Sequence, residues 1–125
     1  MPAPAARRVL LVEDDPMVRS TLASLLRAAG HLVTEADGGA AGIDLLRRSR
    51  LDLVLTDLGM PDVTGWDVAR AAKSQAARLP VILLTGWGEH GAVEPPASGL
   101  VDRVLGKPVR LDDLLTVIRE LTNVD

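Results

Sequence analysis

The fold of this chain is constrained most by a repeated alternation between short apolar runs and segments of helical periodicity. Residues 8–12 form a run of branched apolar side chains, and the apolar residues that follow recur at helical spacing until Gly30. Residues 32–36 and 52–56 are further apolar runs, followed by helical segments at 40–48 and 66–77. Strands joined by crossover helices form a parallel sheet with helices on both faces. The pattern therefore predicts an α/β fold.

The second half of the chain continues this pattern with one interruption. Residues 80–85 (PVILLT) and 100–105 (LVDRVL) predict a fourth and a fifth strand, and residues 111–121 predict a closing amphipathic helix. The interval 86–99 is rich in glycine and contains the pair Pro95 and Pro96. Because an interior proline costs a helix about 3 kcal/mol, we expect the fourth helix to be short, distorted or absent.

Length and composition exclude several classes of protein. The 125 residues are 47% hydrophobic, which suffices for the core of one domain. The 14 basic and 17 acidic residues leave a net charge of −3, so we expect no nucleic-acid binding by this chain alone. Without cysteine, disulfides and thiolate metal sites are impossible. No apolar run approaches the roughly 20 residues of a membrane span, so we expect a soluble, cytoplasmic protein.

Polar side chains follow four of the five predicted strands. Glu13 and Asp14 come directly after the first strand, Asp57 follows the third, Thr85 ends the fourth, and Lys107 comes just after the fifth. Open parallel sheets bind ligands beyond the carboxyl ends of their strands. These five side chains are therefore predicted to meet at one edge of the sheet.

The acidic residues of this group favour a metal site. Asp15 directly precedes a proline and is better explained as the N-cap of the first helix. Glu13 and Asp14 would repel Asp57 unless a cation lay among them, and carboxylate oxygens suit Mg²⁺. A carboxylate beside Mg²⁺ and a lysine can act as a nucleophile toward a phosphoryl group. The sequence thus favours Mg²⁺-dependent phosphoryl transfer to one of these carboxylates.

Four motifs, in this order, resemble the receiver domain of two-component response regulators: VEDD (12–15), LTDLGMPDVTG (55–65), VILLTG (81–86) and GKP (106–108). The resemblance covers almost the whole chain. It implies a flavodoxin-like, doubly wound sheet of five parallel strands in the order 2-1-3-4-5. It also implies a receiver domain at residues 8–122, between an N-terminal segment, 1–7, that we expect to be disordered and a C-terminal tail, 123–125.

The resemblance assigns a role to each site residue by position. Asp57 is the implied phosphoacceptor, Asp14 a direct Mg²⁺ ligand, and Glu13 an acid that acts on the metal through water. Gly59 is the implied backbone-carbonyl ligand of Mg²⁺.

The remaining assignments concern the phosphoryl group itself. Thr85 supplies the hydroxyl that follows the phosphoryl group, and Lys107 is its ion-pair partner. The family also suggests a cis peptide bond between Lys107 and Pro108, which proline permits.

The chain departs from the family where receivers usually pass on their signal. Val104 stands three residues before the lysine, where an aromatic residue is usual, and Val109 stands where an aromatic usually follows the lysine-proline pair. The chemistry is therefore predicted to be intact while the usual aromatic switch is missing. Trp87, two residues past Thr85, is predicted to cover the mouth of the site and to affect the access of water.

Other residues that could carry chemistry have simpler explanations. Asp62 and Asp67 are interpreted as a turn residue and a helix-start acid, and neither is given a chemical role. His31 and His90 lack a second imidazole nearby, so metal ligation is not expected. The glycine-rich GGAAG (38–42) and GKP lack the phosphate-loop and dinucleotide-binding patterns, which disfavours ATP and NAD.

The predicted function is a phosphoacceptor receiver that takes phosphate on Asp57 from a sensor histidine kinase or a histidine phosphotransfer protein. Its chemistry would be limited to its own phosphorylation and dephosphorylation. Its output would be protein contact, a domain in trans, or service as a relay or phosphate sink, and its oligomeric state stays open. Three alternatives remain: a phosphorylation-independent pseudo-receiver, a receiver fragment of a hybrid histidine kinase, and a haloacid-dehalogenase-type phosphohydrolase. A phosphohydrolase of this last class would be expected to have a second aspartate two residues after its nucleophile, and this chain has Gly59 at that position.

Overall fold

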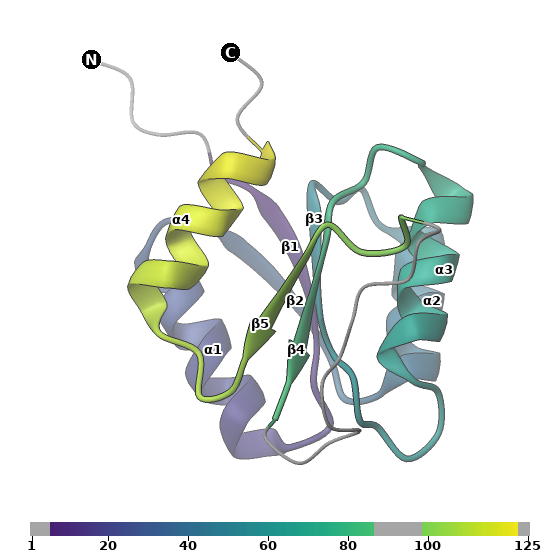
Figure 1. The fold of residues 1–125 in the computed structure, drawn as a ribbon, viewed down its shortest axis with the longest axis horizontal. Coiled ribbons are helices and arrows are strands. Elements are labelled where there is room, and N and C mark those ends of the chain that lie inside the picture. The colour runs from purple at the N-terminus through teal and green to yellow at the C-terminus, as the bar shows by residue number, and fades with distance from the viewer. Residues whose placement is uncertain (1–5, 87–98, 123–125) are drawn as a thin grey trace.

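The computed structural model describes residues 6–86 and 99–122 (Figure 1). Within these residues the elements follow one another as β1 (Arg8–Val12), α1 (Pro16–Ala28), β2 (Leu32–Ala36), α2 (Gly39–Arg48), β3 (Leu53–Asp57), α3 (Gly65–Gln75), β4 (Val81–Thr85), β5 (Arg103–Gly106) and α4 (Leu111–Thr122). The predictions about a fourth helix at 86–99 and about Trp87 fall on residues 87–98, which lie outside the described residues.

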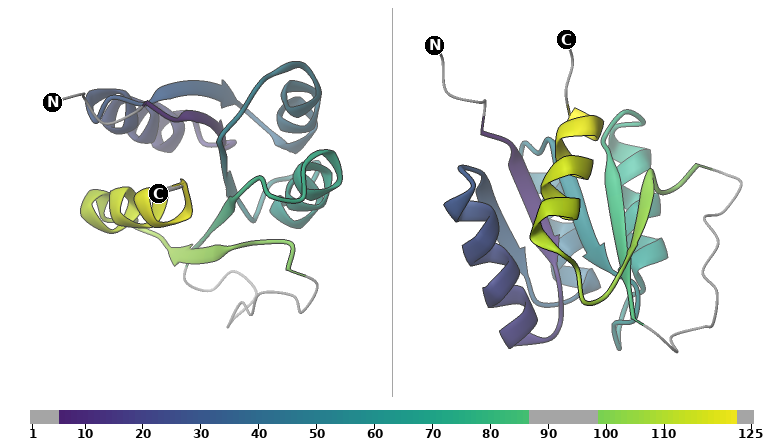
Figure 2. Two further views of the ribbon diagram at one scale, coloured as in Figure 1. Left: turned by 90° about the horizontal axis from the view of Figure 1, so that it is seen from above. Right: turned by 60° about the vertical axis from the view of Figure 1, so that its left-hand side comes forward.

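The strands form one parallel sheet in the order β2-β1-β3-β4-β5, which confirms the predicted topology. Helices α1 and α4 cover one face of the sheet, and α2 and α3 cover the other (Figure 2). Successive residues of a central strand point to opposite faces of the sheet. In β1, Leu10 and Val12 pack toward α2 and α3, whereas Val9 and Leu11 pack toward α1 and α4. The alternation follows from the two-residue period of a strand.

Burial differs between the central and the edge strands. The central strands β3 and β4 consist of buried residues apart from the half-buried Thr85, whereas the edge strands β2 and β5 are partly exposed. A strand covered on both faces needs a continuous apolar run, so the central strands have the clearest sequence pattern. Among the described residues, no helix combines the length and the apolar character that a membrane crossing requires.

The fifth strand begins later than the sequence suggests. Residues 100–105 were expected to form it, but β5 covers Arg103–Gly106. The carboxylate of Asp102 accepts hydrogen bonds from the Val81 amide (2.8 Å) and from Lys73 Nζ (2.7 Å). The Asp102 side chain therefore joins α3 to the start of β4. The Asp102 amide also donates to the Val81 carbonyl (2.8 Å), and regular pairing of β5 with β4 begins one residue later, at Arg103.

The helix starts differ in how they are capped. Asp15 caps α1 by accepting from the amides of Met17 and Val18, as predicted. Thr64 and Asp67 form a reciprocal capping box at the start of α3, which confirms Asp67 as a helix-start acid. At α2 the N-cap residue is Gly38, which offers no side chain for this purpose. The amides that begin α2 therefore need an acceptor from elsewhere in the chain.

Candidate functional site

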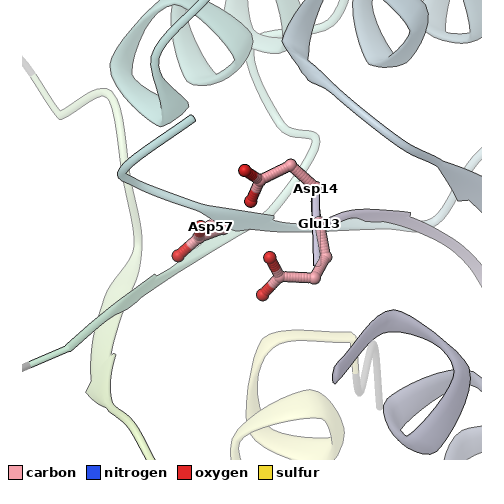
Figure 3. A group of neighbouring side chains, drawn as sticks. All are labelled: Glu13, Asp14 and Asp57. Carbon is pink, nitrogen blue, oxygen red and sulfur yellow. The ribbon is translucent and has the colours of Figure 1, made fainter. Parts of the chain in front are cut away.

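Three carboxylates meet at the carboxyl edge of the sheet (Figure 3). Glu13 and Asp14 directly follow β1, and Asp57 is the last residue of the neighbouring strand β3. Each offers an oxygen atom that lies within 4.8 Å of the other two. Glu13 and Asp57 are almost fully buried, with exposed fractions of 1% and 2%, and Asp14 is half-buried. The structure thus brings together the three acids that the sequence predicted to meet.

Lys107 reaches this cluster from the turn that follows β5. Its ammonium nitrogen Nζ lies 2.9 Å from Glu13 Oε1 and 2.8 Å from Asp57 Oδ1. The Lys107 amide donates to the carbonyl of Thr85 (2.8 Å), which fixes the turn against the end of β4. The peptide bond between Lys107 and Pro108 is cis, as the resemblance to receivers suggested. Within the described residues, Lys107 therefore pairs with two of the three acids, and the cluster keeps an excess of negative charge.

The charges of this cluster alter the proton affinities of its members. Burial raises the pKa of the Glu13 carboxyl above its ordinary value, and the negative charge of Asp57 adds to this, although hydrogen bonds from Lys107 and from the Asp15 amide oppose it. Burial alone would lower the pKa of the Lys107 ammonium, but its hydrogen bonds to Asp57 and Glu13, together with the negative charges of these carboxylates, outweigh burial and raise that pKa. Lys107 is therefore held in its charged form.

Glu13 is also held by two contacts that the sequence did not reveal. The Asp15 amide donates to Glu13 Oε2 (3.1 Å), and the guanidinium of Arg19 donates to the Glu13 backbone carbonyl (2.8 Å). Arg19 also lies 3.5 Å from the carboxylate of Glu35 on β2. Nothing in the sequence marks Arg19, because its role depends on how α1 is placed over β1 and β2.

Thr85 and Gly59 lie at the same edge of the sheet. Thr85 ends β4, is half-buried, and directs its hydroxyl oxygen toward the Gly86 carbonyl at 3.5 Å. Gly59 is exposed in the loop between β3 and α3, between the buried residues Leu58 and Met60. The topology thus places these two residues beside the acidic cluster, and their roles in binding metal and phosphate stay predictions.

The donor set at this edge fits a hard divalent cation. Mg²⁺ prefers oxygen ligands and is usually bound by one or two carboxylates while it keeps several waters. Glu13, Asp14 and Asp57 provide carboxylate oxygens at suitable separations. A cation among them would offset the excess negative charge that Lys107 alone leaves.

A comparison with known protein families identifies the chain. The family model of the response regulator receiver domain matches residues 9–119. This chain belongs to the receiver domain family. The receiver-domain resemblance drawn from the four motifs is therefore confirmed, as is the flavodoxin-like, doubly wound fold that it implied.

Individual relatives agree with this membership. The response regulator receiver protein CpdR of Brucella abortus is 35% identical over 116 residues, which cover 92% of this chain and 96% of CpdR. The probable transcriptional regulatory protein SilR of Salmonella typhimurium is 38% identical over 117 residues, which cover 91% of this chain and 50% of SilR. This receiver chain spans half or less of the length of several curated relatives that it matches.

A solved receiver structure is also similar. The response regulator TrrA from Thermotoga maritima, determined in complex with Mg²⁺ and BeF, superposes with a TM-score of 0.83 at 26% identity. The superposition covers 92% of this chain and 98% of TrrA. The fold of this receiver is thus shared with a protein whose structure contains that metal and that fluoride.

Proposed function

We propose that Asp57 of this receiver accepts a phosphoryl group from a phosphohistidine of a partner protein, in a reaction that needs Mg²⁺. The observation that carries this proposal is the meeting of Glu13, Asp14 and Asp57 with Lys107 at the carboxyl edge of the sheet. Glu13, Asp14 and Asp57 would hold the metal, together with the backbone carbonyl of Gly59. When bound, Mg²⁺ neutralises charge on the phosphoryl oxygens.

The residues of the chain have separate tasks in this reaction. An oxygen of the Asp57 carboxylate attacks phosphorus while the bond between phosphorus and the histidine nitrogen breaks, and the freed imidazole takes up a proton. Lys107 already lies 2.8 Å from Asp57 Oδ1, so its ammonium can pair with the transferred group. The hydroxyl of Thr85, at the end of the neighbouring strand β4, donates to a phosphoryl oxygen.

The partner and the output follow from this chemistry. The donor is a sensor histidine kinase or a histidine phosphotransfer protein, and the signal leaves through protein contacts or a phosphorelay in the cytoplasm. CpdR, which this chain matches over nearly its whole length, is named a receiver protein, whereas SilR is a longer transcriptional regulatory protein. A receiver that belongs to a hybrid histidine kinase would use the same site.

The alternative functions are less well supported. A pseudo-receiver has no need to keep Glu13 and Asp57 buried beside Lys107, which costs desolvation energy. Val104 and Val109 lie where the family usually has aromatic residues, and here both pack against the core. These two valines support a changed route of signalling, and neither is one of the residues proposed to bind Mg²⁺ or the phosphoryl group. Membership of the receiver family disfavours the haloacid-dehalogenase-type phosphohydrolase.

The mass of the intact protein tests the proposal. We expect incubation with acetyl phosphate and Mg²⁺ to add one phosphoryl group, and we expect no addition with EDTA or in Asp57→Asn. If the phosphate is too short-lived to be seen by mass, beryllofluoride is a stable mimic of the phosphoryl group, and its binding with Mg²⁺ can be followed by amide NMR. A folded protein that neither gains mass nor binds beryllofluoride would favour the pseudo-receiver.

A further inference from the structure

The loop between β3 and α3 is attached to the start of α2 by one carboxylate. Asp62 lies in this loop, and its Oδ2 accepts from the Ala40 amide (3.2 Å) while its Oδ1 accepts from the Gly39 amide (3.4 Å). These are the first amides of α2, whose N-cap residue Gly38 makes no side-chain hydrogen bond. An aspartate more than twenty residues away thus supplies the cap that the local sequence lacks.

The loop packs so closely against the two glycines at the start of α2 that a side chain at either position would contact it. A Cβ added to Gly39 would lie 2.5 Å from the Val63 carbonyl oxygen and 2.6 Å from the Val63 Cβ. A Cβ added to Gly38 would lie 3.4 Å from both carboxylate oxygens of Asp62. The GGAAG segment does not fit a nucleotide loop. Its first two glycines instead leave the space in which residues 62 and 63 pack against the start of α2.

Charge favours the same contact. The Val63 amide first, and then the amides of Ala40 and Gly39, hold the pKa of the Asp62 carboxyl below its ordinary value. The carboxylate is therefore ionised at neutral pH, and a negative charge at the amino end of a helix also interacts favourably with the helix dipole. Asp62 joins its own loop to α2 through charge-assisted hydrogen bonds.

We propose that Asp62 is a positioning residue for the metal site, because it holds the loop that carries Gly59 against the start of α2. Gly59 lies three residues before Asp62 and, as a glycine, has the freest backbone of any residue type. Pro61 restricts the backbone between them. Leu58 and Met60 anchor the loop in the core, and Asp62 anchors its far side. The position of the Gly59 carbonyl therefore depends on Asp62.

This inference rests on the proposed function, since it concerns the affinity of the site for Mg²⁺. A Mg²⁺ titration followed by amide NMR of the full chain measures that affinity. We expect Asp62→Ala to weaken Mg²⁺ binding by roughly tenfold, the low end of the range for residues that orient metal ligands. We expect a smaller loss in Asp62→Asn, which keeps one acceptor oxygen. In the parent, Mg²⁺ should also shift the amide signals of Gly39 and Ala40, and this response should disappear in Asp62→Ala.

Two further variants separate position from charge. Asp44→Asn removes the same charge from an exposed residue of α2 that pairs with Arg48, so its Mg²⁺ affinity should match the parent. Gly39→Ala changes no charge but pushes Val63 away, so it should weaken Mg²⁺ binding as Asp62→Ala does.

The outcomes distinguish this inference from the proposed function. If the parent binds Mg²⁺ and both Asp62→Ala and Gly39→Ala bind it equally well, the positioning role of Asp62 is wrong while the metal site stands. A weakened affinity in Asp62→Ala with a normal one in Gly39→Ala would reduce the effect to charge and also overturn the positioning role. A parent that binds no Mg²⁺ would overturn the proposed function and this inference together.

Discussion

Individual side chains at the edge of the sheet bring buried charges together at a cost in stability. Glu13 and Asp57 are buried beside each other, and the ammonium of Lys107 pairs with both carboxylates. Burying charge is unfavourable even when the charges are paired, and hydrophobic residues of similar size would often be more stable. Ionisable groups with perturbed pKa values often cluster at functional sites. This cluster fits that pattern.

His31 gives a residue-level prediction about pH. Its Nδ1 accepts a hydrogen bond from the Arg7 amide (3.2 Å), which requires an unprotonated Nδ1. Burial, together with the charge of Arg7, lowers the pKa of His31 below its ordinary value of 6.5. Because the unfolded chain binds this proton at higher pH than the folded protein does, the free energy of unfolding should fall as the pH falls below about 6.5.

Urea denaturation at pH 7.5 and pH 5.5 measures this dependence. We expect the parent to lose more stability between these conditions than His31→Gln, whose side chain does not titrate. Identical pH dependence in the parent and in His31→Gln would contradict the prediction.

The sequence indicated some of these residues and not others, for a physical reason. Glu13, Asp57 and Lys107 could be predicted because each follows the end of a strand, and the ends of parallel strands meet. Arg19 and Asp62 could not, because their partners are fixed by how helices and loops pack. Asp62 was interpreted as a turn residue, which describes its place in the loop but misses its contact with α2.

At the scale of elements, the loop between β3 and α3 depends on close packing at Gly65. A Cβ there would collide with the backbone oxygen of Asp57, and it would lie 2.7 Å from Leu83 Cδ1 and 2.9 Å from Leu58 Cα. Two of these neighbours are backbone atoms that cannot move without displacing β3. Only glycine therefore allows α3 to begin so close to Asp57.

We predict that Gly65→Ala lowers the free energy of unfolding by about 1–3 kcal/mol, the usual cost of overpacking. The sign is informative, since alanine in a helix would otherwise be more favourable than glycine. Urea denaturation of Gly65→Ala and of a control, Gly106→Ala, provides the measurement. A Cβ at Gly106 meets no atom within 4 Å, so the control should keep the stability of the parent. Equal stabilities of the two variants would show that the loop adapts.

Elements were predictable where a local pattern dictates them. The bounds of β1 and β2 agree with the prediction, and the cap at Asp15 was foreseen, because apolar runs and an aspartate before a proline are local features. The start of β5 was placed too early, because the Asp102 side chain bonds to β4 and α3. The sequence also showed no sign that Asp62 caps α2, because the N-cap residue Gly38 has no side chain and the capping residue lies in a distant loop.

At the scale of the whole molecule, the order of strands is what creates the site. In the order β2-β1-β3-β4-β5, β1 and β3 are neighbours, so their ends lie side by side. Strand β4 lies next to β3 on its other side, and β5 lies next to β4. The acids at the ends of β1 and β3 therefore lie at the same edge of the sheet as the hydroxyl at the end of β4 and the lysine after β5. The alternation of apolar runs and helical segments predicted the parallel sheet, but the order of strands came from the resemblance to receivers.

The most direct test of the central claim is to locate the phosphate on the chain. Treatment of the phosphorylated protein with borohydride reduces an aspartyl phosphate to homoserine, and mass spectrometry of the digested protein then identifies the modified residue. We predict homoserine at position 57 alone, formed only after incubation with acetyl phosphate and Mg²⁺. Homoserine at Asp14 or at another acidic residue, or its formation in Asp57→Asn, would contradict the assignment of Asp57 as the phosphoacceptor.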